Sequence, residues 1–168
     1  VLFRSPTGER FETLVNPGRP IPQRATRIHG ITDAMVALAP DMTTALRAFR
    51  HFTEDAVLIA HNAPFDMGLL RSAATETGAE FPNRVLDTVL LSAMVWGKSA
   101  PHSLDALAER LGVTIPPEAR HTAMGDAEAA AQIFLRLIPA LRAKGLGDLD
   151  AIRDQARQYR RLIADANR

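Results

Sequence analysis

The run AVLIAHN, from Ala56 to Asn62, constrains the fold more than any other stretch of the sequence. Its first five residues are apolar without alternation, and its length is that of a strand buried on both faces. Strands of this kind belong to parallel sheets, because crossover helices cover both faces of such a sheet. We therefore expect a central strand here, with at least one parallel neighbour.

Helical and strand-like patterns alternate after this run. Residues 63–78 predict a helix, 84–94 predict a short strand that passes into a helix, and 103–112 predict a further helix. The expected helix ends carry typical capping residues: Asn62 and Gly78 for the first helix, Ser103 and Gly112 for the last. This order of elements predicts an α/β fold.

The part of the chain before this run is less regular. Residues 10–15 alternate as a strand does and stop at the Pro/Gly-rich loop NPGRPIP. Two short helical patterns follow, and Thr32 and Asp41 are their candidate N-caps. The segment 143–150, AKGLGDLD, predicts a hinge before a last Arg-rich amphipathic helix.

A long helix is predicted to begin near Asp126. Seven apolar residues recur at helical spacing and predict its buried face: Ala127, Ala130, Ala131, Phe134, Leu135, Ile138 and Leu141. His121 and Asp126 are five residues apart, so they converge only if His121 lies in the loop that enters the helix. The alternative is that Asp126 only complements the helix dipole and His121 is a surface residue.

A second polar cluster follows the predicted buried strand. His61 and Asn62 lie at its carboxyl end, and Asp66 lies in the first turn of the next helix. Open α/β sheets place their sites at this edge. Capping and dipole complementation are again the alternative explanation. Two acidic helix starts in one chain favour a site.

Composition limits the classes of function. The chain has 168 residues, 46% hydrophobic and 23% charged, which is ordinary for one globular domain. A net charge of +1 provides no strong global attraction for nucleic acid, so a polyanion requires local patches or cations. The absence of cysteine excludes disulfides and thiolate metal sites and suits a cytoplasmic protein. No apolar run approaches the ~20 residues of a membrane span, so we expect no membrane partner.

Four segments together carry a resemblance to a known family. The segments HNAPFD, HSLDALAERLGV, HTAMGDAEAAAQIFL and NPGRPIPQRATRIHGIT resemble those of the DEDDh 3′–5′ exonucleases, and the pattern is most similar to the epsilon-type proofreading exonucleases. The resemblance covers residues 11–141. It implies a ribonuclease H-like α/β fold with a mixed sheet flanked by helices. It also implies release of nucleoside monophosphates from a single-stranded or frayed 3′ end of DNA. RNA is the alternative substrate. A DNA polymerase subunit is the implied protein partner.

The resemblance assigns roles to individual residues. Asp66 and Asp126 match metal-binding carboxylates, and oxygen ligands of this type suit two Mg²⁺ or Mn²⁺ ions. Two such ions stabilise both the attacking and the leaving oxygen. His121 matches the general base, because a neutral imidazole accepts a proton near neutral pH. Residues that match the substrate pocket are His29, Gly30, Ile31, Asn62 and Phe65.

The family's first motif, D-x-E on the first strand, has no counterpart before Phe11. Glu9 and Glu12 lack an aspartate two residues earlier. The residues 10–15 instead resemble the family's third strand, so we expect an N-terminally truncated exonuclease domain over 1–144, with a C-terminal helical extension over 145–168. The chain as written is then expected to be inactive. The alternative is a non-catalytic nucleic-acid-binding or scaffolding relative that has lost the motif.

Four other residues are assigned structural roles. Asp87 is expected in a turn or cap, and His102 in a capping loop. His51 is expected on a solvated helix surface, and Trp96 at a core or rim position rather than stacked on a base.

Overall fold

The computed structural model describes residues 7–120 and 122–159, which divide into two compact units. We call residue 7 with 57–66 and 84–159 the strand unit, and 8–56 with 67–83 the helical unit. Helix α4 (Ala63–Thr77) begins in the strand unit and continues in the helical unit. Each unit is described by itself.

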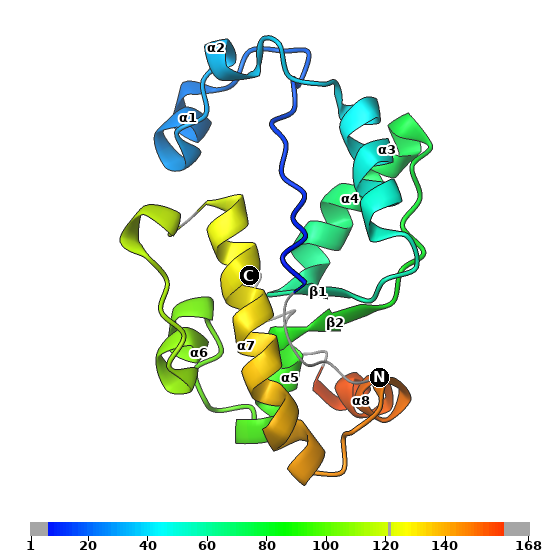
Figure 1. The fold of residues 1–168 in the computed structure, drawn as a ribbon, viewed down its shortest axis with the longest axis vertical. Coiled ribbons are helices and arrows are strands. Elements are labelled where there is room, and N and C mark those ends of the chain that lie inside the picture. The colour runs from blue at the N-terminus through cyan, green and yellow to red at the C-terminus, as the bar shows by residue number, and fades with distance from the viewer. Residues whose placement is uncertain (1–6, 121, 160–168) are drawn as a thin grey trace. The chain divides into compact units, whose positions relative to one another are not determined.

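Two parallel strands form the sheet of the strand unit (Figure 1). Strand β1 (Leu58–Ala60) pairs with β2 (Val85–Asp87), and Ala60 lies opposite Asp87. The prediction of an α/β fold with parallel strands is therefore confirmed. The central position predicted for β1 is not seen, because within the described ranges β1 pairs with β2 alone and its residues are half-buried rather than buried.

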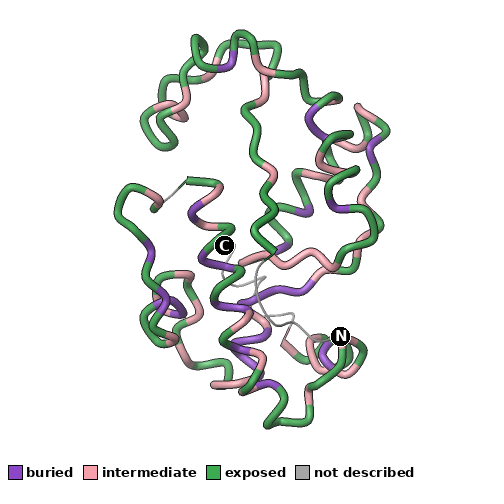
Figure 2. The backbone as a smooth tube through the Cα atoms, in the orientation of Figure 1, coloured by how far each residue is buried: buried purple, intermediate pink, exposed green. Residues whose placement is uncertain are grey.

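Helices cover this strand pair and form the core of the unit. Helix α7 (Ala123–Ala143) contacts β1, α5 (Thr88–Trp96) and α6 (Leu104–Leu111), and α8 (Leu149–Ala156) packs on α5. Short 3₁₀ turns cover Pro117–Ala119 (η1) and Arg157–Tyr159 (η2). Figure 2 shows buried residues concentrated along α5 and α7. The largest fully buried apolar side chains are Leu91, Leu107, Ile133, Leu137 and Leu141.

The buried face of α7 differs from the predicted one. Its buried residues are Gly125, Ala129, Ala130, Ile133, Phe134, Leu137 and Leu141. The prediction was wrong for Ala127 and Ala131, which are exposed, and it omitted Ile133 and Leu137. Alanine tolerates either side of a helix, whereas large aliphatic side chains gain most from burial and therefore orient the helix.

The helix starts predicted at Thr32, Asp41 and Ser103 are confirmed by their hydrogen bonds. Thr32 accepts a hydrogen bond from the Met35 amide at the start of α2 (Asp33–Val36), and Asp41 accepts one from Thr44 at the start of α3 (Met42–Thr53). Ser103 caps α6 through the Ala106 amide. Gly78 and Gly112 have φ of 71° and 65° after α4 and α6, which is the left-handed conformation that favours glycine.

The helical unit is held by aromatic packing. The Phe11 ring lies 5.6 Å from both Phe49 and Phe52, and Phe49 lies 5.5 Å from Phe81. The strand predicted for 10–15 is not observed: residues 7–15 have no regular structure, and only Asn16 forms a bridge, to Asp41. A strand needs a neighbouring strand to pair with, and the sheet of the described residues consists of β1 and β2 alone.

Helix α1 (Gln23–His29) was not predicted; it directly follows the Pro/Gly-rich loop. None of the helices in the described ranges is both long and apolar enough to cross a membrane.

Candidate active site

The site begins at the carboxyl ends of β1 and β2. Because Ala60 and Asp87 are in register, the residues that follow each strand emerge at the same edge of the parallel pair. His61 and Asn62 follow β1, and Thr88 follows β2. Polar residues distant in sequence therefore meet at one edge, as the sequence predicted for this end of the buried strand.

Asp87 links the two chain segments that leave this edge. Its side chain is 6% exposed. Its carboxylate accepts hydrogen bonds from the amides of Asn62 (3.1 Å), Ala63 (2.9 Å) and Val89 (2.9 Å). Burial raises the pKa of Asp87, and the hydrogen bonds from backbone amides oppose that rise. The expected capping role is confirmed for α5, and the same carboxylate also binds the amides at the start of α4.

His61 is held against the start of α5. Its Nδ1 lies 2.8 Å from the hydroxyl of Thr88, which is fully buried and also lies 3.4 Å from the Ala60 carbonyl. Burial lowers the pKa of His61, and the negative charge of Asp126 partly opposes this effect. Burial therefore favours the neutral form of the ring, and the charge of Asp126 favours the protonated form to a smaller extent.

Asp66 and Asp126 each lie in the first turn of a helix, as predicted. Asp66 lies in α4, one turn after Asn62, and Asp126 lies in α7. Asp66 is exposed, yet partial desolvation by the surrounding protein raises its pKa. Asp126 is half-buried. Both carboxylates belong to the strand unit.

The entry to α7 is tightly built. Thr122 is its N-cap: the hydroxyl accepts a hydrogen bond from the Gly125 amide at 3.0 Å and donates one to the Ala119 carbonyl at 2.8 Å. A Cβ on Gly125 would lie 2.0 Å from that same carbonyl oxygen. Arg120 pairs with Asp105 of α6 at 2.5 Å. His121, which the sequence places in this loop, lies outside the described residues.

His102 closes the loop between α5 and α6. The Gly97 carbonyl only accepts, so Nε2 of His102 donates to it at 3.0 Å; in the neutral ring, Nδ1 then accepts from the buried Ser92 hydroxyl at 2.7 Å. Burial is the main cause of the lowered pKa of His102. His102 therefore has the structural role expected of it. Trp96 lies half-buried at the rim with the Arg110 guanidinium over its ring, also as expected.

The unfolding free energy should report the lowered pKa of His102. Such a histidine binds more protons in the unfolded state, so its stabilising contribution is present above about pH 6.5 and decreases as the pH falls below it. In urea unfolding between about pH 8 and pH 5, wild type should lose stability relative to His102→Gln as the pH falls. The difference in unfolding free energy between wild type and Gln132→Ala, a change at an exposed and non-titrating residue, should stay constant over the same pH range. If the difference in unfolding free energy between wild type and His102→Gln did not change with pH, the expectation would be contradicted.

The predicted substrate-binding residues fall in both units. Asn62 and Phe65 lie in the strand unit: Asn62 has a left-handed φ of 63°, and the Phe65 side chain is 65% exposed. His29, Gly30 and Ile31 lie in the helical unit at the end of α1. There the Ile31 amide donates to Nδ1 of His29 at 3.0 Å, and Gly30 takes a φ of 75°. This hydrogen bond and the left-handed conformation of Gly30 fix the local shape of the HGI turn.

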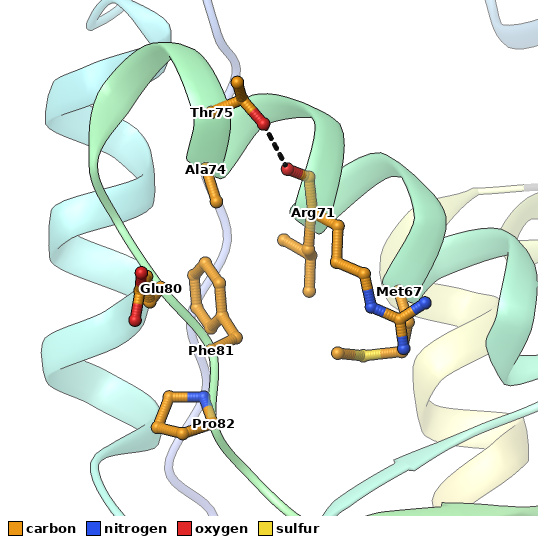
Figure 3. A pocket seen from close by; sticks show the side chains of 8 residues that line it. Met67, Arg71, Ala74, Thr75, Glu80, Phe81 and Pro82 are labelled. Atoms are coloured by element: carbon orange, nitrogen blue, oxygen red, sulfur yellow. Dashed lines mark hydrogen bonds between the residues drawn. The ribbon is translucent and has the colours of Figure 1, made fainter.

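The helical unit contains a hollow of about 380 Å³ (Figure 3). Figure 3 shows it between the middle of α4, which contributes Met67 and Arg71, and the segment 80–82, which contributes Phe81. Among the predicted site residues that the structure describes, none lines this hollow.

The carboxylates provide the right ligand chemistry for a divalent cation but an incomplete set. Asp66 and Asp126 supply the hard oxygen donors that Mg²⁺ and Mn²⁺ prefer. Among residues 7–120 and 122–159, however, there is no group of three or more His, Cys, Asp or Glu side chains placed to hold a metal. The described residues therefore do not form a closed metal site by themselves.

Sequence reasoning missed the joining role of Asp87 and the partnership of Thr88 with His61. The signal for both was the DT pair at the carboxyl end of β2, which resembles the HN pair after β1. The sequence pattern does not encode the register between β1 and β2. This register brings His61 to Thr88 and Asn62 to Asp87, pairs that are 27 and 25 residues apart, within hydrogen-bonding distance.

The fold and the site define a class. Residues 3–134 match the profile of the Exonuclease (RNase T) family, and the chain belongs to this family. Its fold class is accordingly α/β and ribonuclease H-like, and the recognition of an epsilon-like exonuclease from the sequence is confirmed.

Individual relatives make the similarity more specific. The chain is 57% identical over 164 residues to a DNA polymerase III subunit epsilon-like protein of Rhodobacter capsulatus, covering 98% of this chain and 23% of that protein. It is 37% identical to a putative bifunctional exonuclease/endonuclease protein of Mycobacterium tuberculosis, covering 92% of this chain and 25% of that protein. The chain thus spans about a quarter of the length of these relatives.

A solved structure is also similar. Exonuclease X in complex with 5′-overhanging duplex DNA aligns with a TM-score of 0.64 and 28% identity, over 85% of this chain and 78% of that one.

Proposed function

We propose that the chain is a 3′–5′ exonuclease domain that releases nucleoside monophosphates from DNA 3′ ends. The observation that carries this proposal is the placement of His61 directly after β1 and of Asp66 and Asp126 in the first turns of α4 and α7, with the charge of Asp126 acting on the pKa of His61. Membership of the exonuclease family supports the reaction class. The DNA in the exonuclease X complex supports DNA rather than RNA as the substrate.

The residues have distinct proposed roles. Asp66 and Asp126 would hold Mg²⁺ or Mn²⁺, which when bound would stabilise charge on the attacked phosphate and on the leaving oxygen. His121 would accept the proton of the attacking water. Substrate contacts are proposed for His29, Gly30, Ile31, Asn62 and Phe65. A polymerase subunit is the proposed partner, on the strength of the name of the R. capsulatus relative.

The small number of carboxylates proposed to bind the metal limits the activity that we expect of this chain. Mg²⁺ gives up its water reluctantly and needs several carboxylate or phosphate oxygens. Asp66 and Asp126 alone would bind it weakly, so the 168-residue chain is expected to be inactive until the family's D-x-E strand is supplied. The same observation favours the second candidate function, a nucleic-acid-binding relative without catalysis.

The test compares two proteins: the 168-residue chain, and a strand-extended chain that carries the D-x-E strands of another exonuclease-family member before residue 7. On a 5′-labelled single strand with Mn²⁺, we expect the strand-extended chain to give a ladder of shortened labelled products. A labelled mononucleotide at the first time point would instead indicate attack from the 5′ end.

A circular single strand is the control substrate, and Asp126→Ala is the control variant. The circle should stay intact, because an exonuclease needs an end, and Asp126→Ala should abolish the ladder. Cleavage of the circle would contradict exonuclease action. Binding of the linear strand without digestion by the strand-extended chain would decide for the non-catalytic alternative.

A further inference from the structure

The carboxylate of Asp87 joins two helices that would otherwise begin independently. It is the N-cap of α5 through Val89, and it also accepts the amides of Asn62 and Ala63 at the start of α4. An ordinary cap satisfies free amides of one helix. Here one side chain satisfies the amides of two helices that follow neighbouring strands. The starts of both helices are thereby tied to one point at the edge of the strand unit.

We propose that Asp87 is a positioning residue of the exonuclease site, which sets the place of Asp66 and His61 by fixing the start of α4. Asp66 lies four residues after Asn62, so one turn of rigid helix links the anchored amides to this carboxylate. This inference rests on the proposed function only for its catalytic consequence.

The backbone at Asn62 shows why an anchor is needed. Asn62 has a φ of 63°, which is uncommon for a residue other than glycine and carries a conformational cost. Its amide and that of Ala63 both point to the Asp87 carboxylate, which holds the turn in this conformation. Without the carboxylate, the chain after β1 would relax toward an ordinary conformation, and the first turn of α4 would change direction.

His61 is tied to the same edge by the next residue. Thr88, directly after Asp87, lies 2.8 Å from Nδ1 of His61. The two neighbouring residues Asp87 and Thr88 therefore hold three consecutive residues of the other segment: His61, Asn62 and Ala63. A change in the β2–α5 turn would be transmitted directly to the HNAPFD segment.

The chemistry of the anchor requires a carboxylate. The two oxygens of Asp87 serve three amide donors, with Oδ1 accepting from Asn62 and Val89 and Oδ2 from Ala63. In Asp87→Asn one oxygen becomes an NH₂ group, which donates and cannot accept. At least one of the three amides then loses its partner in a buried place. Asp87→Glu keeps the charge, but the additional methylene must fit where the aspartate side chain is 6% exposed.

Amide hydrogen exchange on the 168-residue chain tests the positioning. In wild type, the amides of Asn62, Ala63 and Val89 should be protected to a similar degree, since one carboxylate protects all three. In Asp87→Asn, exchange of at least one of the amides of Asn62 and Ala63, which bind different oxygens, should rise at least tenfold more than exchange in α6. The matched control is Asp148→Asn, which removes an exposed aspartate that caps α8 through the amides of Asp150 and Ala151; it should leave Asn62 and Ala63 unchanged.

Two results would overturn the inference. One is rapid exchange of Asn62 and Ala63 in wild type, which needs no variant to fold. The other is a uniform rise in exchange over the strand unit in Asp87→Asn, which would indicate a merely structural role. If Asp87→Asn does not fold, Asp87→Glu replaces it; exchange should then rise at Asn62 and Ala63 more than in α6, and a uniform rise over the strand unit would again overturn the inference.

Catalysis provides the second readout. In the strand-extended chain, Asp87→Asn should lower kcat by about 10²-fold with KM nearly unchanged, because a displacement of about 1 Å at a reacting group has an effect of this size. A KM change with an unaltered kcat would oppose positioning. Inactivity of the wild-type strand-extended chain would refute the proposed function, whereas the exchange pattern would still decide the role of Asp87.

Discussion

His121→Ala in the strand-extended chain is expected to lower turnover by about 10²–10⁴-fold, the usual contribution of a positioned general base. Substrate binding should change little, because the imidazole acts on the water and not on the nucleotide. The measurement is single-turnover digestion of a 5′-labelled strand, with binding followed separately by fluorescence anisotropy without metal. Glu118→Gln, at an exposed position of η1, is the control and should keep wild-type turnover.

The residues on either side of His121 make this variant informative. Thr122 is held on one side by Ala119 and Gly125, and Arg120 is held by Asp105, so the two neighbours of His121 have fixed partners. Alanine at position 121 should therefore remove the imidazole while the flanking hydrogen bonds remain. A variant that digests DNA at the wild-type rate would remove His121 from the proposed mechanism.

Local signals in the sequence were sufficient for the helix ends. Capping by Thr32, Asp41 and Ser103 depends on an amide three residues away, so the pattern alone determines the contact. The same holds for Gly112, whose φ of 65° few other residues adopt readily. These features need no knowledge of the tertiary fold.

Features that depend on distant parts of the chain were predicted less well. The alternation of residues 10–15 is typical of a strand, but alternation alone does not supply a pairing partner. The rotation of α7 was misjudged because alanines were weighted like Ile133 and Leu137, whose burial is decided by contacts with other elements. The threefold hydrogen bonding of Asp87 depends on the register of β1 with β2, which no local pattern encodes.

The site shows the same division. Both predicted acidic residues lie in the first turn of a helix, and His61 lies at the end of β1, as the sequence indicated. Asp126 acts on the pKa of His61 through its charge although the two residues are 65 positions apart, and it can do so because α7 packs against β1. Motif order indicated the family, whereas the pairing of β1 with β2 and the packing of α7 against β1 are encoded in no single motif.

Gly125→Ala is expected to destabilise the protein by about 2–4 kcal/mol, combining overpacking of about 1–3 kcal/mol with loss of a cap of about 1 kcal/mol.

The added Cβ would lie 2.0 Å from the Ala119 oxygen and 2.7 Å from its carbonyl carbon, and backbone at this distance cannot yield as a flexible side chain does. That oxygen also accepts hydrogen bonds from the hydroxyl and amide of Thr122, so relieving the clash breaks the cap that starts α7 one turn before Asp126. Gly68→Ala, inside α4 with open space around its Cβ position, is the matched control and should instead stabilise by about 0.5–1 kcal/mol, because alanine favours helix. Urea unfolding followed by circular dichroism measures both. Equal and stabilising effects of the two substitutions would show that η1 does not press on α7, and that the entry to the site is looser than the contact between Ala119 and Gly125 requires.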